Sequence, residues 1–257
     1  MRLSRIQKNF EALASEDPLW TVLSEKGKRG GGWDPDEFYQ TGEDEIRDLH
    51  QRLAALGIPM RGATALDFGC GVGRLTFPLS RRFGHCIGID ISESMIRAAK
   101  ENSGRGESCK FIVNTSDSLS CLESGSIDFA YSDIVFQHMP RRYMKGYFLE
   151  ISRALRPGGH FAFQLPSHLN RASPQNAGAF RMARKRLHYA TKNVAQLLGL
   201  AKPYFEMNPM PRRSVTDFCE RRAGLNLKAL WSHPGAGDSW HGYLYVFEKS
   251  LQRGEAS

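Results

Sequence analysis

The segment Asp67-Phe68-Gly69-Cys70-Gly71-Val72-Gly73 decides the fold of this chain. It completes an apolar run, residues 64–68, that is typical of a buried strand, and it leads into a predicted helix over residues 72–82. Glycines at such a turn let the backbone bend sharply and let a ligand come close. The unpaired N–H groups at the start of the helix add positive potential. We therefore expect a ligand site at the carboxyl end of this strand.

Two common nucleotide-binding patterns do not fit this turn. A dinucleotide fingerprint, G-x-G-x-x-G, would need a glycine at position 74, where the chain has Arg74. A phosphate-binding loop would need a lysine followed by serine or threonine, and none follows. The pattern present is an acid, Asp67, and then G-x-G-x-G.

The chain on both sides of this turn alternates short apolar runs with helical spacing. Such alternation predicts a mostly parallel sheet with helices on both faces. A helix predicted over 215–223, capped by Ser214, precedes two adjacent strands that a Gly/Pro-rich turn joins, which adds an antiparallel hairpin at the edge of the sheet. The predicted fold is therefore a Rossmann-like, doubly wound, seven-stranded α/β sheet. The other predicted strands are 86–90, 110–113, 127–132, 160–164, 227–233 and 243–248, and the other helices 93–101 and 141–155.

Helical segments flank and interrupt this pattern. Residues 1–25 are predicted as one helix, a glycine-rich basic loop follows, Asp34-Pro35 opens a second helix, and a third covers 42–56. We expect residues 1–60 to form a helical cap and 61–250 a second unit with a helical insertion at 167–213. Within the insertion, 180–198 is an amphipathic helix with a basic face. A lid is the favoured role for it, and a dimer contact or a membrane-surface element are the alternatives.

Bulk composition excludes several classes of protein. The 257 residues have ordinary apolar and charged fractions, 41% and 24%, and a net charge of +8, which favours acidic partners although the basic residues are spread along the chain. The five cysteines show no C-x-x-C spacing, so neither a disulfide framework nor a zinc site is predicted. No signal peptide or membrane span is visible, and we expect a cytoplasmic protein.

The acid followed by G-x-G-x-G resembles the first motif of the class I S-adenosylmethionine-dependent methyltransferases, and the resemblance extends over residues 64–165. It implies that the turn formed by Gly69, Cys70, Gly71 and Gly73 passes beneath the methionine part of S-adenosylmethionine. It also implies that Asp67 helps to hold the methionine ammonium. A ligand that carries a sulfonium and an ammonium suits an acid, whereas a pyrophosphate does not.

Two further acids stand where this family meets the rest of the cofactor. Asp90 ends the second predicted strand, and the resemblance implies that its two acceptor oxygens meet both ribose hydroxyls. Asp117 follows the third strand and is implied to meet the adenine amino group. The alternatives are an acid that only begins a helix, for Asp90, and an acid that only forms a turn, for Asp117. The other cofactor contacts implied here are Ile91, Met95 and Ser118.

Residues 127–139 resemble the family's fourth strand and the segment after it. The resemblance implies that Ser132 faces the methionine part and that Gln137 and His138 edge the pocket. If the methyl acceptor is a hydroxyl, a base is also needed. His138 is the candidate base, ahead of His168 and His241, with a structural histidine as the alternative for each. No metal-ligand spacing stands out.

The predicted function is methyl transfer from S-adenosylmethionine to a small molecule, on oxygen or nitrogen, such as a sugar, lipid or secondary metabolite. An anionic acceptor would suit the charge. Methylation of RNA or protein and cofactor binding without catalysis are the alternatives, although no RNA-binding module is recognisable. Trp33, Phe38 and Tyr39 are expected either to close the pocket or to anchor the N-terminal helices.

Overall fold

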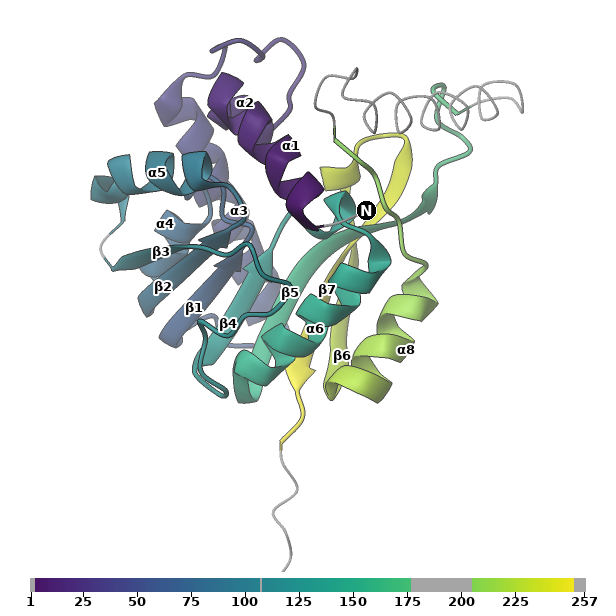
Figure 1. The fold of residues 1–257 in the computed structure, drawn as a ribbon. Coiled ribbons are helices and arrows are strands. Elements are labelled where there is room, and N and C mark those ends of the chain that lie inside the picture. The colour runs from purple at the N-terminus through teal and green to yellow at the C-terminus, as the bar shows by residue number, and fades with distance from the viewer. Residues whose placement is uncertain (1–2, 107, 177–204, 252–257) are drawn as a thin grey trace, which may run out of the picture.

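The computed structural model describes residues 3–106, 108–176 and 205–251. Its centre is a seven-stranded sheet in the order β3-β2-β1-β4-β5-β7-β6 (Figure 1). β7 runs antiparallel to β5 and β6, and the other neighbours are parallel, which confirms the predicted sheet and its antiparallel hairpin. The strands are β1 (Gly62–Phe68), β2 (Phe83–Asp90), β3 (Cys109–Val113), β4 (Ile127–Ser132), β5 (Leu155–Leu169), β6 (Leu225–His233) and β7 (Trp240–Lys249).

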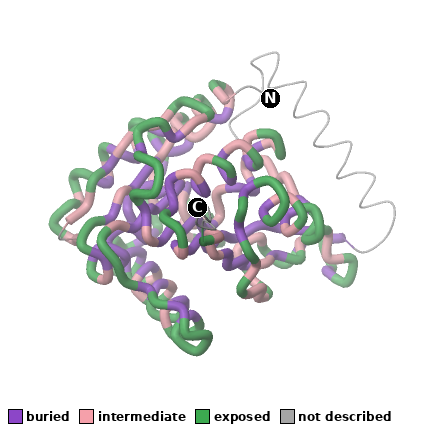
Figure 2. The backbone as a smooth tube through the Cα atoms, turned by 90° about the horizontal axis from the view of Figure 1, so that it is seen from below, coloured by how far each residue is buried: buried purple, intermediate pink, exposed green. Residues whose placement is uncertain are grey.

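Helices cover both faces of this sheet, as the alternating pattern predicts. In Figure 1 α6 and α8 lie on the face toward the viewer, and α3 and α4 lie behind it. Figure 2 shows the exposed stretches mostly at the periphery of the molecule and the buried ones further in. The α-helices are α1 (Leu3–Glu16), α2 (Pro18–Val22), α3 (Pro35–Ala54), α4 (Thr76–Ser80), α5 (Glu93–Glu101), α6 (Arg141–Ala154) and α8 (Arg212–Ala223), and the short 3₁₀ turns are η1 (Ser103–Arg105), η2 (Phe136–His138) and η3 (Pro234–Ala236).

The sequence predicts a break between two helices near Gly42, but α3 is continuous through it. The reason is a tertiary contact. A Cβ at position 42 would lie 2.1 Å from the carbonyl oxygen of Arg74, in the turn that follows the glycine loop. Glycine therefore serves here to bring α3 against that turn.

The prediction of one helix over residues 1–25 is also wrong. α1 ends at Glu16, and the side chain of Asp17 caps the new helix α2 by accepting a hydrogen bond from the backbone N–H of Trp20 at 3.1 Å. An aspartate followed by Pro18 is a typical helix start, and the two short helices can therefore meet at an angle.

Two other helices differ from their predicted bounds. The helix after the glycine loop is only α4, because the chain turns through Gly73, whose φ is +89°, before it becomes helical. α8 begins at Arg212, directly after Pro211, so Ser214 lies within the first turn and does not cap it. The predicted helix 180–198 lies outside the described residues.

The N-terminal helices lie across one end of the sheet. In Figure 1 α1 and α2 sit above the strands at the same end as the loop between β6 and β7. α1 contacts α5, which follows β2. Within residues 3–106, 108–176 and 205–251 no helix is both long and apolar enough to cross a membrane. Because α1, α2 and the loop between β6 and β7 all lie at the carboxyl end of the sheet, segments from both ends of the chain cover it.

Candidate active site

A cleft of about 1410 Å³ lies at this covered end of the sheet. Its floor includes Gly69 and Gly71 after β1, Asp90 at the end of β2, and the segment after β4. Residues 21–26, which follow α1, line it from the N-terminal side, and residues 232–240, between β6 and β7, line the opposite wall. The cleft therefore joins the glycine loop to surfaces from distant parts of the chain.

The glycine loop is held close to its neighbours on both sides. The backbone N–H groups of Gly69 and Cys70 both donate to the carbonyl of Ile89, at 2.7 and 3.0 Å. A Cβ on Gly69 would lie 2.3 Å from a methyl of Val135, and one on Gly71 would lie 2.6 Å from a methyl of Val22. The absence of side chains at these two positions is what lets the cleft reach the backbone.

Asp90 faces the glycine loop across the cleft floor. Its Oδ2 accepts a hydrogen bond from the N–H of Gly71, and its Oδ1 accepts one from the N–H of Ser92, both at 2.9 Å. Burial raises the pKa of Asp90, while these backbone bonds lower it. Each carboxylate oxygen keeps a second lone pair, so the group can still accept from two hydroxyls of a ligand.

Asp67 does not line the cleft. It is 1% exposed, and its Oδ2 accepts a hydrogen bond from Oγ1 of Thr76 at 2.6 Å. Burial raises the pKa of Asp67 to about 7, against the opposing effects of the Thr76 bond and the nearby Arg74 charge. The acid of the motif therefore supports the base of the loop from behind.

The remaining sequence-predicted cofactor residues divide into two groups. Ile91, Met95 and Gln137 line the cleft together with Gly69, Gly71 and Asp90. Asp117 is exposed on the turn after β3, and Asn114, on the same turn, is the residue that lines the cleft there. The predicted residues that are absent from the lining are Asp67, Cys70, Gly73, Asp117, Ser118 and Ser132.

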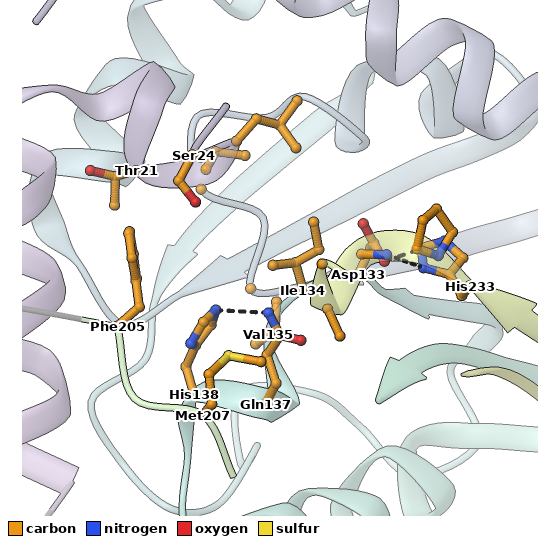
Figure 3. Close-up of a pocket in the computed structure, with 18 of the residues that line it drawn as sticks. Thr21, Ser24, Asp133, Ile134, Val135, Gln137, His138, Phe205, Met207 and His233 are labelled. Atoms are coloured by element: carbon orange, nitrogen blue, oxygen red, sulfur yellow. Dashed lines mark hydrogen bonds and ion pairs between the residues drawn. The ribbon is translucent and has the colours of Figure 1, made fainter. Parts of the chain in front are cut away.

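The chain turns sharply after β4. Oγ of Ser132 donates to the carbonyl of Phe68 at 2.8 Å and ties the ends of β4 and β1 together. Ile134 then has a φ of +56°, in the left-handed region that costs a β-branched residue about 1–2 kcal/mol. Figure 3 shows Ile134 and Val135 in the middle of the cleft, between two polar pairs.

The first of these pairs is Gln137 and His138. Nδ1 of His138 lies 2.7 Å from the carbonyl oxygen of Glu206, so it carries the proton and donates. The amide of Gln137 lies 3.2 Å from Nε2 of His138 and donates to it, and Gln164 donates in turn to Gln137 at 3.3 Å. Burial lowers the pKa of His138 to about 4. The imidazole is therefore neutral at physiological pH, and the lone pair on its Nε2 accepts a hydrogen bond from the Gln137 amide.

The second pair, Asp133 and His233, belongs to a buried charged cluster. Arg74 lies between two acids, with its Nη2 2.8 Å from Glu45 and 3.6 Å from Asp133. Oη of Tyr131 donates to Glu45 at 2.7 Å. Nε2 of His233 lies 3.8 Å from Oδ1 of Asp133 (Figure 3). Arg74 does not line the cleft but the other four residues do, so two acids, Glu45 from α3 and Asp133 after β4, face it.

The N-terminal side of the cleft is fixed by polar and aromatic contacts. Glu11 of α1 accepts a hydrogen bond from Oγ of Ser92 at 2.6 Å and others from Ser94 at the start of α5. The ring of Phe10 packs against His138 and Phe205, with centroid distances of 5.6 and 6.0 Å. α1 thus bridges the Asp90 side of the cleft and the His138 side.

The three N-terminal aromatic residues that the sequence singled out have different positions. Trp33 lines the cleft, and its Nε1 donates to the carbonyl of Leu23 at 3.0 Å. Phe38 and Tyr39 are buried, and Tyr39 packs against Phe77 and donates through its hydroxyl to the carbonyl of Val72 in the glycine loop at 3.2 Å. Phe38 and Tyr39 therefore anchor the N-terminal helices, whereas Trp33 lies at the cleft.

Sequence reasoning missed several residues of the cleft. Phe10, Glu45 and Asp133 come from segments whose place depends on tertiary packing, as does the wall formed by 232–240. A signal existed for Asp133, because it follows β4 directly at the carboxyl end of the sheet. No sequence signal pointed to Phe205 and Met207, which line the cleft near His138.

Comparisons with known proteins agree with this geometry. A family model described as a methyltransferase domain matches residues 66–163. A trans-aconitate 2-methyltransferase of Deinococcus radiodurans is 31% identical over 144 residues, which cover 55% of this chain and 52% of that protein. One from Acidovorax sp. strain JS42 is 27% identical over 192 residues, 70% of this chain and 69% of that protein. The chain thus spans about half the length of the first of these relatives.

Solved structures share the fold over a longer stretch. Magnesium protoporphyrin IX methyltransferase from Synechocystis PCC 6803, with bound S-adenosylhomocysteine, superposes with a TM-score of 0.63 at 14% identity and covers 96% of this chain and 99% of that one. Residues 66–163 thus match a methyltransferase domain family, and the chain shares the fold of S-adenosylmethionine-dependent methyltransferases.

Proposed function

We propose that this protein transfers the methyl group of S-adenosylmethionine to a carboxylate oxygen of a small organic acid. The observation that carries the proposal is the single cleft that joins the Gly69–Asp90 floor to the His138 side. A volume of about 1410 Å³ exceeds the usual 300–1,000 Å³ of a pocket for one small ligand, so it has room for a cofactor and a small acceptor together.

The residues on the cleft floor fit this cofactor. Asp90 has free lone pairs for a diol, and the bare backbone at Gly69 and Gly71 forms a cradle that a Cβ would fill. Met95 and Ile91 supply apolar surface in the same cleft, against which the adenine ring can pack. When bound, S-adenosylmethionine supplies a methyl carbon on a positively charged sulfur that leaves as a neutral thioether.

The acceptor would lie between α1 and the segment after β4. Phe10, Phe205 and Met207 give this part of the cleft an apolar wall, and Gln137 and His138 give it polar groups. Such a wall excludes water and holds the acceptor in line with the methyl carbon, which is the main contribution that a protein makes to this displacement. We expect the wall to orient the acceptor.

The choice of a carboxylate rests on His138. A hydroxyl acceptor needs a base, but the Nε2 lone pair of His138 is occupied by Gln137, and its pKa of about 4 makes it a weak base. A carboxylate is already ionised and nucleophilic at neutral pH. The names of the trans-aconitate 2-methyltransferase relatives support an organic acid as the class of acceptor.

Two measurements test the proposal in sequence. Calorimetry should show binding of S-adenosylmethionine and S-adenosylhomocysteine but not of NAD, and preference for NAD would refute the use of this cofactor. A panel of di- and tricarboxylates, alcohols and amines should then yield S-adenosylhomocysteine and a methyl ester only with carboxylates. Turnover of an alcohol or amine without turnover of any carboxylate would refute the acceptor class while leaving the cofactor assignment intact.

A further inference from the structure

We infer that Asp133, with Glu45 behind it, holds the ammonium group of the cofactor's methionine, and that Asp67 does not. The inference rests on the proposed use of S-adenosylmethionine. It departs from the family resemblance, which gives this role to the acid before the glycine loop. Four observations carry it: the position of Asp67, an unpartnered oxygen on Asp133, the charges around Arg74, and the register of β1 with β4.

Asp67 is not accessible to a ligand in the cleft. Its carboxylate is 1% exposed and lies outside the lining, and one oxygen already accepts from Thr76 at 2.6 Å. A ligand ammonium would have to pass the backbone of the glycine loop to reach it. Asp67 can therefore affect the cofactor only through the loop that it supports.

Asp133 has the opposite properties. Its side chain is 2% exposed and lines the cleft, yet its Oδ1 accepts no hydrogen bond from any residue that the structure describes. Nε2 of His233 lies 3.8 Å from this oxygen, beyond hydrogen-bonding distance. Nδ1 of His233 accepts from the N–H of Gly235 at 3.1 Å, and burial lowers the pKa of this histidine, so it stays neutral. A buried carboxylate oxygen without a donor marks a place for a ligand donor.

The charges around Arg74 do not balance. Two carboxylates, Glu45 and Asp133, approach one guanidinium, at 2.8 and 3.6 Å. The shorter contact goes to Glu45, so Asp133 is the acid left without a full partner. Burial and the nearby Glu45 raise the pKa of Asp133, against the opposing effect of Arg74, and a ligand cation at Oδ1 would stabilise the ionised form.

The register of the sheet places Asp133 beside the glycine loop. Asp67 and Tyr131 are paired in the parallel β1–β4 ladder. Two residues further along each chain stand Gly69 and Asp133, on adjacent strand ends. Because β4 lies on the opposite side of β1 from β2, a cofactor held at Asp90 that crossed Gly69 would reach the Asp133 side of the cleft.

Ligand truncation in calorimetry tests this inference. S-adenosylhomocysteine contains the ammonium, whereas 5′-methylthioadenosine keeps the adenine, ribose and thioether but lacks the amino-acid end. D133N should raise the Kd for S-adenosylhomocysteine about tenfold or more and change the Kd for methylthioadenosine by less than about twofold. D67N should change both affinities by the same small factor, because it acts through the loop.

A deaminated analogue of S-adenosylhomocysteine completes the test. The wild type should bind it about tenfold more weakly than the parent, and D133N should bind the two equally. E45Q, at the less buried acid, should give a smaller loss of the same selectivity and serves if D133N does not fold. The inference would be overturned if D133N and E45Q bound S-adenosylhomocysteine, its deaminated analogue and methylthioadenosine with equally reduced affinity. It would also be overturned if D67N lost affinity only for S-adenosylhomocysteine. Failure of the wild type to bind any of the ligands would instead refute the proposed function.

Discussion

The carboxylate of Glu11 on α1 accepts a hydrogen bond at 2.6 Å from Oγ of Ser92, which lies two residues after Asp90. Ser92 also caps α5, since its Oγ accepts from the N–H of Met95 at 3.2 Å. Burial alone would raise the pKa of Glu11, but the bonds from Ser92 and Ser94 outweigh it, so the pKa lies below its usual range. α1 is therefore fastened by an ionised group at the edge of the candidate cofactor site.

Replacing Glu11 should loosen this fastening. E11Q keeps the shape but loses the charge-assisted bonds, each of which contributes about 1.5–3 kcal/mol at most. We expect S-adenosylhomocysteine to dissociate about tenfold faster, because α1 then opens more readily over the cleft. Stopped-flow tryptophan fluorescence can follow this, since Trp33 lines the cleft and Trp20 packs against Phe205, which also lines it.

E16Q on the same helix is the matched control. The pair that Glu16 forms with Arg29 is exposed, with 64% of the Glu16 side chain accessible, and such surface pairs contribute about 0–1 kcal/mol. Its dissociation rate should match the wild type. Equal rates for E11Q and the wild type would show that α1 does not control release of the cofactor.

Asp90 and Asp117 should differ as cofactor ligands although the sequence assigns a role to both. D90A removes the acceptor that faces Gly71 and should weaken S-adenosylhomocysteine binding about 30-fold or more, as the loss of charged hydrogen bonds implies. D117N changes an exposed side chain outside the cleft lining and should shift the Kd by less than about twofold. Calorimetry on both variants decides this. A large loss of affinity in D117N would support the contact between Asp117 and adenine that the family resemblance implies.

The comparison of these two acids shows what sequence reasoning can reach. Asp90 ends a strand at a fixed distance from the glycine loop, so the local pattern determines that the two meet. Asp117 stands on a turn, whose shape depends on bonds such as those of the Asn114 amide to Ser116 and Ser118. Spacing alone does not reveal which turn residue faces the cleft.

Tertiary packing also explains why the sequence did not predict the charged cluster and why it wrongly predicted a break in α3. Glu45 reaches Arg74 only because α3 packs against the loop, and Gly42 permits that approach. Helix propensity treats this glycine as a break because it does not include a neighbour that is remote in sequence. The sheet order could be predicted because it follows from regular alternation and crossover rules.

Gly42 provides a test of this packing argument. In an exposed helix, Gly→Ala stabilises by about 1 kcal/mol. G42A should instead destabilise the protein by about 1–3 kcal/mol, because the new methyl would overlap the Arg74 carbonyl. Chemical denaturation measures the free energy of unfolding, and weaker S-adenosylhomocysteine binding should accompany the loss because the glycine loop must shift.

G146A in α6 is the corresponding control. A Cβ there would meet its nearest neighbour, the Asp117 carbonyl oxygen, at 3.9 Å, which is ordinary contact. This variant should gain about 0.5–1 kcal/mol from helix propensity. If G42A were as stable as G146A, the close approach of α3 to the loop would be wrong.

The pH dependence of activity can show whether His138 orients the acceptor or acts as a general base. Its pKa of about 4 lies below the ordinary value, so the neutral form predominates above that pH and protonation begins only as the pH falls toward 4. With a carboxylate acceptor, kcat/KM should therefore show no inflection near pH 6.5. H138Q should lower kcat/KM about tenfold or less by disturbing Gln137, whereas loss of a general base would cost about 10²–10⁴-fold. An inflection near pH 6.5 in the wild type that disappears in H138Q would identify His138 as a base and point to a hydroxyl acceptor.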